Sequence, residues 1–101
     1  MKLALFGYGG HAREVAAQID DDITFFVSDE YANDVAKPIS EFNPSEYMMM
    51  VAVADSRDRY DIVQRLPKET QYFTFIHPTA LLMDTIEIGE GSFIGAHSIL
   101  T

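Results

Sequence analysis

Short apolar runs alternate with amphipathic stretches along the chain as far as Ile76. Four runs predict strands, at Lys2–Phe6, Ile23–Val27, Met48–Val53 and Tyr72–Ile76. Helical spacing of apolar residues predicts one helix over Ala12–Ile19 and a second that starts after a cap at Asp55 or Ser56 and ends near Leu66, before Pro67. In the second helix, Tyr60, Val63 and Leu66 are predicted to face the core. The proline-containing segment Lys37–Pro44 is predicted to wrap an edge of the sheet.

The order of these elements is typical of a parallel sheet, because strands alternate with helices that can serve as crossovers. Continuous apolar strands, such as Phe25–Val27 and Met48–Met50, indicate burial on both faces of that sheet. The predicted fold class is therefore α/β, with a small Rossmann-like parallel sheet. It corresponds to one half of a dinucleotide-binding fold rather than to the whole.

A different pattern begins at Ile76. Aliphatic residues recur at every sixth position, at Ile76, Leu82, Ile88, Ile94 and Leu100, and glycine follows two of them directly. No helix or ordinary strand has this period, whereas one side of a left-handed parallel β-helix is one hexapeptide. We therefore expect a Rossmann-like domain over residues 1–76 and the start of a left-handed β-helix over residues 77–101.

The hexapeptide segment has room for little more than one coil. A single coil cannot cover its own inward-facing row of aliphatic residues, because stacked neighbours supply that core. Since the sequence stops inside the repeat, at Thr101, we expect the chain to be a truncated part of a longer protein.

Acidic residues outnumber basic ones by 16 to 7, which gives the 101-residue chain a formal net charge of −9. An acidic surface repels phosphate backbones and anionic lipids, so we expect no nucleic-acid partner. No apolar stretch is long enough for a membrane span, and no signal peptide is recognisable. The chain has no cysteine, which fits a cytoplasmic location. Any bound phosphate would be held by backbone N–H groups and a helix dipole rather than by a basic patch.

Three glycines, Gly7, Gly9 and Gly10, follow the first strand and open the first helix. Glycine permits unusual backbone conformations and lets a ligand approach the main chain closely. The N–H groups that follow have no intrahelical partner, and the positive end of the helix dipole lies behind them. The sequence thus predicts a phosphate site at this loop; the alternative is a tight strand-to-helix turn without a ligand.

Five further residues are candidates for contacts with the same ligand. His11 opens the helix and could donate to a phosphate or sugar, or could pack as a polar helix-start residue. Asp29 and Glu30 follow the second strand, where an acidic residue commonly accepts from a ribose hydroxyl or a base N–H; the alternative is a solvated loop charge. Ala54 and Asp55 end the third strand at the same edge, and Asp55 also suits a helix N-cap.

The other two histidines lie near the hexapeptides. His77 precedes Pro78 at the junction of the two patterns, and His97 lies within the repeat. The spacing of the three histidines fits no metal-ligand pattern, so we expect no metal site. Met48–Met50 is expected to be core strand.

Four segments together carry a resemblance to a known family. They are F-G-Y-G-G-H-A-R-E-V at Phe6–Val15, the strand Val51–Val53 with Ala54-Asp55, I-H-P-T-A at Ile76–Ala80 and I-G-E-G-S-F-I-G at Ile88–Gly95. With these segments the chain resembles the sugar O-/N-acyltransferases of the sialic acid O-acetyltransferase (NeuD) and PglD type, over nearly its whole length.

The resemblance implies a Rossmann-like domain that binds a nucleotide-linked sugar and a β-helix that trimerises and binds acetyl-CoA between neighbouring subunits. The positions that match the family's sugar-nucleotide contacts are Gly9, Gly10, His11, Asp29, Glu30 and Ala54, with Asp55 beside the last. The family often has glycine where this chain has Ala54. Its general base is a histidine further along the β-helix, so the catalytic residue is expected beyond Thr101.

The activity that the resemblance implies is N-acetylation, by acetyl-CoA, of a nucleotide-linked 4-amino-4,6-dideoxy sugar for surface polysaccharide or glycan synthesis. Two alternatives stay open: O-acetylation of sialic acid or a related sugar, and a non-catalytic sugar-nucleotide-binding fragment. An NAD-dependent redox domain is disfavoured, because the α/β unit is short and hexapeptides follow it.

Overall fold

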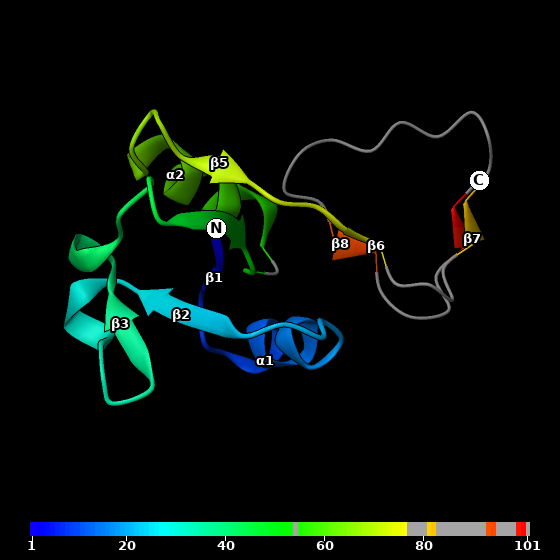
Figure 1. The fold of residues 1–101 in the computed structure, drawn as a ribbon, viewed down its shortest axis with the longest axis horizontal. Helices are drawn as coiled ribbons and strands as arrows, with labels where there is room; N and C mark the ends of the chain where they lie inside the picture. Colours follow the sequence, from blue (N-terminus) through cyan, green and yellow to red (C-terminus); the bar gives the residue numbers. More distant parts are fainter. Residues whose placement is uncertain (54, 77–80, 83–92, 95–98, 101) are drawn as a thin grey trace.

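A parallel sheet with helices on its faces is followed by a second region of short paired strands (Figure 1). The structure is a computed structural model that describes residues 1–53, 55–76, 81–82, 93–94 and 99–100. The sheet contains β1 (Lys2–Phe6), β2 (Ile23–Val27), β3 (Ala36–Pro38), β4 (Tyr47–Val51) and β5 (Gln71–Tyr72). The helices are α1 (Gly10–Ala17) and α2 (Ser56–Arg65), with 3₁₀ turns η1 (Asp29–Tyr31) and η2 (Ile39–Glu41). Among the described residues, no helix is long and apolar enough to cross a membrane.

The sheet order is β3-β2-β1-β4-β5, and every neighbouring pair is parallel. From β1 the chain moves outward through β2 to β3, then returns to β4 on the other side of β1 and continues to β5. Phe6, at the end of β1, lies beside Phe26 of β2 and Val51 of β4, so the carboxyl ends of three strands meet at one edge. This arrangement confirms the predicted α/β class and its parallel sheet.

Both faces of the sheet are covered, as the continuous apolar strands predict. On one face Leu5 and Met50 pack with Val15 of α1. On the other face Phe26 and Met49 lie in the cluster that α2 covers. These five side chains are the largest fully buried ones, and the burial of each contributes about 1.5–3 kcal/mol.

The segment predicted to wrap a sheet edge contributes a strand of its own. Ala36–Pro38 forms β3, and Ala36 is buried where it pairs with Phe25 of β2. Pro38 has no N–H, but an edge strand needs only one side of its hydrogen-bonding groups, so proline is tolerated there. A three-residue strand that contains proline gives almost no apolar pattern, and the sequence analysis therefore missed it.

The predicted strand Tyr72–Ile76 is divided between two pairings. Gln71–Tyr72 is β5 and pairs with β4, whereas Phe75–Ile76 is a separate strand, β6, which pairs with β8 (Phe93–Ile94). The apolar run alone could not reveal this change of partner, because both halves are equally apolar. The chain therefore leaves the sheet two residues before β6 begins.

The predicted inward face of α2 is wrong in two of its three residues. Leu66, just past the end of α2, is buried, with 8% of its surface exposed, but Tyr60 is 65% exposed and Val63 is 37% exposed. Ile62 packs on the core with Leu66 instead. Residues four apart lie on one side of a helix, whereas each single step turns by about 100°, so Tyr60 and Val63 lie off the face that Ile62 and Leu66 define.

The second region pairs its strands at the spacing expected of hexapeptide coils. Ile76 is the partner of Ile94 in β6 and β8, and Leu82 is the partner of Leu100 in β7 (Leu81–Leu82) and β9 (Ile99–Leu100). Both pairs are 18 residues apart in sequence, and one coil of three hexapeptides requires this separation. The left-handed β-helix itself and the domain division at residue 76 stay predictions.

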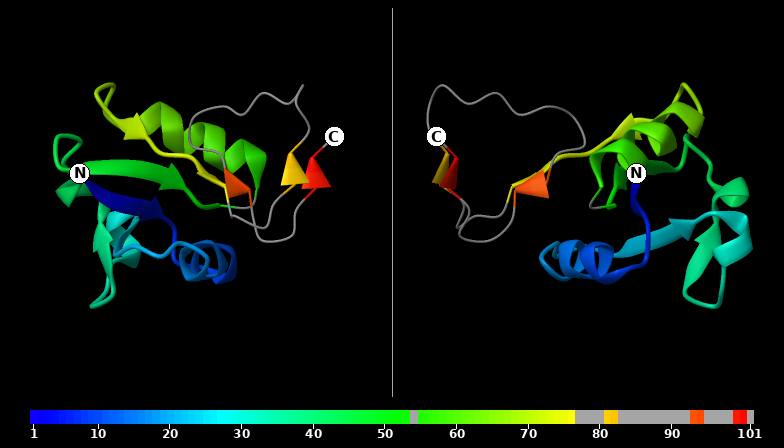
Figure 2. Two further views of the ribbon diagram at one scale, coloured as in Figure 1. Left: turned by 45° about the vertical axis from the view of Figure 1, so that its right-hand side comes forward. Right: turned by 180° about the vertical axis from the view of Figure 1, so that it is seen from behind.

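Phenylalanine side chains join this region to the core of the sheet. Phe73, Phe75 and Phe93 pack against the cluster that contains Val15 of α1, and the rings of Phe75 and Phe93 stack with centroids 5.5 Å apart. Both views in Figure 2 show β6 and β8 on the side of the sheet where α1 lies. The second region therefore begins in contact with the core cluster to which the sheet and α1 both contribute.

Candidate functional site

The candidate site is the carboxyl edge of the sheet between β1 and β4. Ligands of open α/β sheets bind beyond the carboxyl ends of the strands, at the point where the strand order reverses, and here that point lies between these two strands. Short turns follow both strands, so α1 and α2 both begin at this edge. The N–H of Gly7 donates to the Phe26 carbonyl (2.8 Å) and the N–H of Ala52 donates to the Phe6 carbonyl (3.0 Å), which extends the ladder up to the edge.

The glycines of the loop have different physical roles. Gly7 has a φ of +118°, and a Cβ at this position would lie 3.1 Å from the carbonyl oxygen of Ala52, so the turn itself requires glycine. A Cβ at Gly9 or Gly10 would meet no atom within 4 Å. These two positions therefore leave open space beside the start of α1, where a ligand can approach the main chain.

The two helices that begin at this edge differ at their N-termini. The Asp55 carboxylate caps α2 and accepts from the N–H groups of Arg57 (2.9 Å) and Asp58 (3.0 Å), which confirms its predicted capping role. The N-cap of α1 is Gly9, which offers no side-chain acceptor, and the first turn of α1 contains no acidic residue. The first N–H groups of α1 are thus available to an anion, whereas a protein carboxylate already occupies those of α2.

Two other predicted residues lie next to these helix starts. His11 is the second residue of α1, and its side chain is exposed. Ala54 lies outside the described residues, but Val53 and Asp55 on either side of it are described. The structure therefore brings His11 to the same turn as the two open glycines.

The acidic pair lies one strand further along the same edge. Asp29 and Glu30 form η1 directly after β2 and are both exposed. Asp29 Oδ1 accepts a hydrogen bond of 3.0 Å from the Ser40 N–H, which ties η1 to η2. If a phosphate binds at α1, these carboxylates lie where acceptors for a ribose or a base are commonly found.

Two arginines at this edge were missed by the sequence analysis. Arg13 Nε donates to the Gly9 carbonyl at 3.4 Å, and its guanidinium lies 5.7 Å from the centre of the Tyr8 ring. Arg59 Nη1 donates to the Val53 carbonyl at 2.9 Å. Each arginine follows the N-cap of its helix by four residues, and this repeated spacing is the sequence signal that could have found them.

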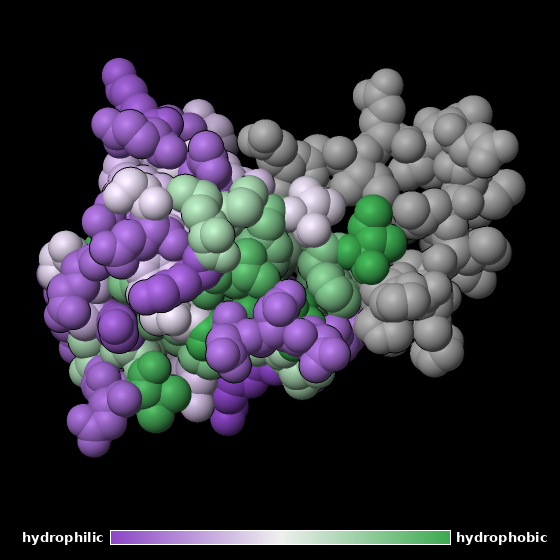
Figure 3. Space-filling model, in the orientation of Figure 1, coloured by the Kyte–Doolittle hydropathy of each residue, from purple (hydrophilic) through white to green (hydrophobic). Residues whose placement is uncertain are grey.

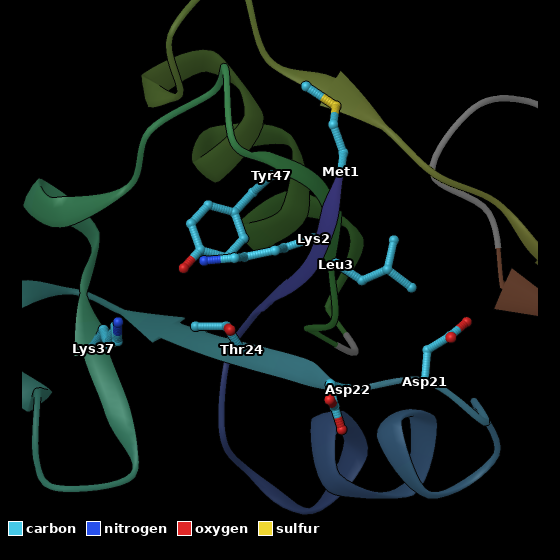
Figure 4. A pocket seen from close by; sticks show the side chains of 8 residues that line it. All are labelled: Met1, Lys2, Leu3, Asp21, Asp22, Thr24, Lys37 and Tyr47. Carbon is cyan, nitrogen blue, oxygen red and sulfur yellow. The ribbon is translucent and has the colours of Figure 1, made fainter.

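A wide, open hollow of about 620 Å³ lies at the opposite edge of the sheet. Figure 4 shows its lining side chains, which come from the amino ends of the strands, from β3 and from the residues before β2: Met1, Lys2, Leu3, Asp21, Asp22, Thr24, Lys37 and Tyr47. Lys2 lies along the Tyr47 ring, with Nζ 5.7 Å from its centre. The hollow has no part in the candidate site, because ligands of such sheets bind at the carboxyl edge.

A smaller cavity of about 120 Å³ lies between α2, η2 and the ends of β1 and β2. Its walls are mainly apolar, with Ser28 and Arg65 as polar members: Phe6, Ser28, Ile39, Ile62, Arg65 and Leu66. In the view of Figure 3, hydrophilic side chains lie at the left and along the top and bottom of the described part, and more apolar surface lies in its middle and towards the right.

The described residues of the carboxyl edge are equipped for binding. They offer N–H donors at α1, positive charge at two arginines and acceptors at two carboxylates. Among the described residues, no group of three or more histidine, aspartate or glutamate side chains could hold a metal ion. Away from this edge, burial raises the pKa of Tyr72, which lies in β5.

Two solved sugar acetyltransferases share this fold. The acetyltransferase domain of PglB from Neisseria gonorrhoeae, also solved with acetyl coenzyme A, is 26% identical, with a TM-score of 0.74 over 97% of this chain and 55% of its own. PerB from Caulobacter crescentus, solved with CoA and GDP-perosamine, is 19% identical, with a TM-score of 0.77 over 100% of this chain and 54% of its own. No protein-family model and no curated protein matches the chain.

These likenesses confirm the resemblance to the sugar acyltransferases of the PglD and NeuD type. The chain spans about half the length of the two solved proteins. Its parallel sheet and helices match the Rossmann-like N-terminal part of that fold.

Proposed function

We propose that the chain is the nucleotide-sugar-binding part of an acetyltransferase that transfers an acetyl group from acetyl-CoA to an amino sugar linked to a nucleotide. The observation that carries the proposal is the uncapped N-terminus of α1 at the point where the strand order reverses. An anion is the natural ligand of such a helix start. The fold shared with PglB and PerB supports a sugar nucleotide as the source of that anion.

In the proposed complex the diphosphate lies against Gly9, Gly10 and His11. Both glycine positions are open, so a phosphate oxygen can reach the main-chain N–H groups directly. The ribose and base then extend over the end of β2 towards Asp29 and Glu30. Ala54 and Asp55 line the other side of the ligand, with Asp55 also holding the start of α2.

The proposed reaction joins the amino nitrogen of the sugar to the acetyl carbon. A C–N bond forms, the C–S bond of the thioester breaks, and CoA leaves as the thiol. A general base takes the proton of the attacking amine, and the resemblance assigns this role to a histidine beyond Thr101. The contribution of the described residues is to hold the sugar nucleotide in one orientation, which supplies much of the rate of a two-substrate reaction.

The remaining parts of the proposal rest on the resemblance alone. They are a homotrimer, acetyl-CoA bound between neighbouring β-helices, a 4-amino-4,6-dideoxy sugar as acceptor, a cytoplasmic location and a role in surface polysaccharide or glycan synthesis. Transfer to a hydroxyl of sialic acid or a related sugar, and binding without catalysis, are the competing outcomes. Product analysis after incubation with acetyl-CoA and candidate sugars separates the three.

Calorimetric titration of the chain with UDP-, dTDP-, GDP- and CMP-linked sugars tests the binding proposal. We expect one of them to bind, and we expect Gly10→Val to weaken that binding about tenfold or more, because the added methyl groups occupy the phosphate position. The matched control is Ala17→Val at the other end of α1, which introduces the same β-branched side chain and should bind normally. Binding of none of the four, or unchanged binding by Gly10→Val, contradicts the proposal.

A further inference from the structure

Arg13 and Arg59 occupy equivalent positions in the two halves of the sheet. Gly9 is the N-cap of α1 and Asp55 is the N-cap of α2, and each arginine lies four residues after its cap. Each side chain also turns back to a main-chain carbonyl of the turn that precedes its helix: Arg13 to Gly9 and Arg59 to Val53. Both guanidinium groups are therefore held at the carboxyl edge instead of extending into solvent along their helices.

The two turns that hold these side chains are neighbours. Phe6 and Val51 are direct partners in the β1–β4 ladder, and such strands lie about 4.8 Å apart. Gly9 and Val53 follow these partners by only a few residues. Arg13 and Arg59 are therefore bonded to neighbouring turns of this edge, Arg13 at the start of α1 and Arg59 before the start of α2.

Aromatic packing restricts the first of the two arginines. The Tyr8 ring contacts the Phe25 ring edge to face, with centroids 4.8 Å apart, and the Arg13 guanidinium lies over the Tyr8 ring. Phe25 belongs to β2, so the stack ties the position of Arg13 to the sheet. A cation on an aromatic ring loses less conformational freedom when it then binds an anion.

The protein is acidic overall, so positive charge at the positions of Arg13 and Arg59 matters for the binding of an anion. Only 7 of the 101 residues are basic, against 16 acidic ones. An anion that approaches such a protein is repelled at long range, so positive charge at its binding site has to be local. Three of the seven basic residues lie within the first four residues of the two helices that begin at this edge, and the side chains of two of them, Arg13 and Arg59, turn back to it.

We propose that Arg13 and Arg59 bind the second phosphate group of the ligand, so that the site selects diphosphates over monophosphates. In this arrangement the N–H groups of α1 hold one phosphate, and the two guanidinium groups hold the next from either side. The inference rests on the proposed function only in taking the α1 N-terminus as the anion site. The two arginines are thus binding residues that set the specificity for a diphosphate.

The test compares inorganic pyrophosphate with inorganic phosphate, together with UDP, dTDP, GDP and CDP, by calorimetry on the purified chain. We expect Arg13→Met and Arg59→Met each to weaken pyrophosphate binding about tenfold or more and to weaken phosphate binding much less. Lys68→Met is the matched control, because it removes one positive charge from an exposed turn outside the site. Added salt should weaken the binding of pyrophosphate less in the arginine variants than in the wild type.

Each outcome decides between the proposals. If the wild type binds a nucleoside diphosphate and both arginine variants keep its preference for pyrophosphate over phosphate, the arginine proposal is overturned while the proposed function stands. If the wild type binds pyrophosphate but no nucleotide, and both arginine variants weaken that binding, the arginine proposal stands and the nucleotide-sugar function is overturned. If the wild type binds neither, both are wrong.

A structural role of Arg59 is separated from a binding role by a second variant. Loss of the Arg59–Val53 bond could unfold the turn, so Arg59→Lys is included, which keeps the charge but loses the planar fork. We expect it to fold and to bind pyrophosphate with an affinity between those of the wild type and Arg13→Met. If Arg59→Lys and Arg13→Met both prefer pyrophosphate over phosphate as strongly as the wild type does, the proposal is overturned, whatever their melting temperatures are.

Discussion

At the scale of single residues, the glycines of the loop after β1 have different roles: one is required by the fold, and another leaves space for a ligand. Gly7 has a left-handed backbone and lies close to the Ala52 carbonyl, so it is required by the fold. Gly10 has helical conformation and open space around it. The motif in the sequence does not distinguish the two, because both are simply glycine after a strand.

Alanine substitutions at these two glycines should change stability in opposite directions. Gly7→Ala adds a Cβ in a disfavoured backbone conformation against a main-chain oxygen, and we expect a loss of about 1–3 kcal/mol in the free energy of unfolding. Gly10→Ala replaces glycine in a helix, and we expect a gain of up to about 1 kcal/mol. Urea unfolding followed by circular dichroism measures both, and equal effects at the two sites would show the assignment to be wrong.

Tyr72 gives the stability of the protein a dependence on alkaline pH. Burial raises the pKa of the Tyr72 hydroxyl because the ionised form is poorly solvated there. The folded protein therefore holds this proton more tightly than the unfolded chain does. The corresponding stability is complete below the unfolded pKa of about 10 and is lost as the pH rises from there through the folded pKa.

The variant Tyr72→Phe tests this dependence. Its urea midpoint should fall less than that of the wild type between roughly pH 8 and pH 11, because phenylalanine has no proton to lose. If the urea midpoint of Tyr72→Phe falls with pH as steeply as that of the wild type, Tyr72 is not the source of the alkaline pH dependence.

At the scale of elements, the sequence predicted most strands and helices but not all of their neighbours. Both helices and the strands β1, β2 and β4 appear within a few residues of the predicted positions, because each carries a clear apolar period. The edge strand β3 was missed, and the run at Tyr72–Ile76 was divided between two pairings. Which strand pairs with which depends on the path of the whole chain, and a local apolar run carries no record of it.

The inward face of α2 provides a direct test at this scale. Leu66→Ala should lower the free energy of unfolding by about 2–4 kcal/mol, because it removes a buried side chain from the core. Tyr60→Ala should change it by no more than about 0.5 kcal/mol, because its side chain is largely exposed. Chemical denaturation of both variants decides the orientation, and equally large losses in the two variants would restore the face predicted from the sequence, which contains both residues.

At the scale of the whole molecule, the hexapeptide region is anchored to the α/β core. Phe75 stacks on Phe93, and both pack on the cluster under α1. The pairing of Ile76 with Ile94 and of Leu82 with Leu100 agrees with the hexapeptide period that the sequence shows. Contact between the two regions could not be predicted, because no local pattern identifies the partner of an aromatic residue.

A double-mutant cycle on the two phenylalanines measures this anchoring. Phe75→Ala and Phe93→Ala should each reduce the free energy of unfolding by about 1–3 kcal/mol. The reduction in the double variant should be smaller than the sum of the two single reductions. The expected coupling is about 0.5–1.5 kcal/mol, which is typical of an aromatic pair. Additive losses would mean that the two rings do not stack in solution.

The candidate site shows how far sequence could reach. The glycine loop and five further residues were predicted as site residues because they directly follow apolar strands, and parallel strands end at a common edge. These five are His11, Asp29, Glu30, Ala54 and Asp55, and their role in binding stays a prediction. The capping of α2 by Asp55 was also predictable, because a capping bond spans only two or three residues. Arg13 and Arg59 were not identified, since a charged residue inside a helix is ordinarily part of its solvated face.

The sequence by itself determined the features that depend on residues close together in the chain. These are the periods of strand, helix and hexapeptide, the position of the glycine turn and the acidic charge. The tertiary structure alone decided the order β3-β2-β1-β4-β5, the reversal between β1 and β4 and the return of two arginines to the turns that precede their helices. The reason is one of range. Backbone conformation and capping act over a few residues, whereas strand order and the meeting of two helix starts depend on residues far apart in the chain.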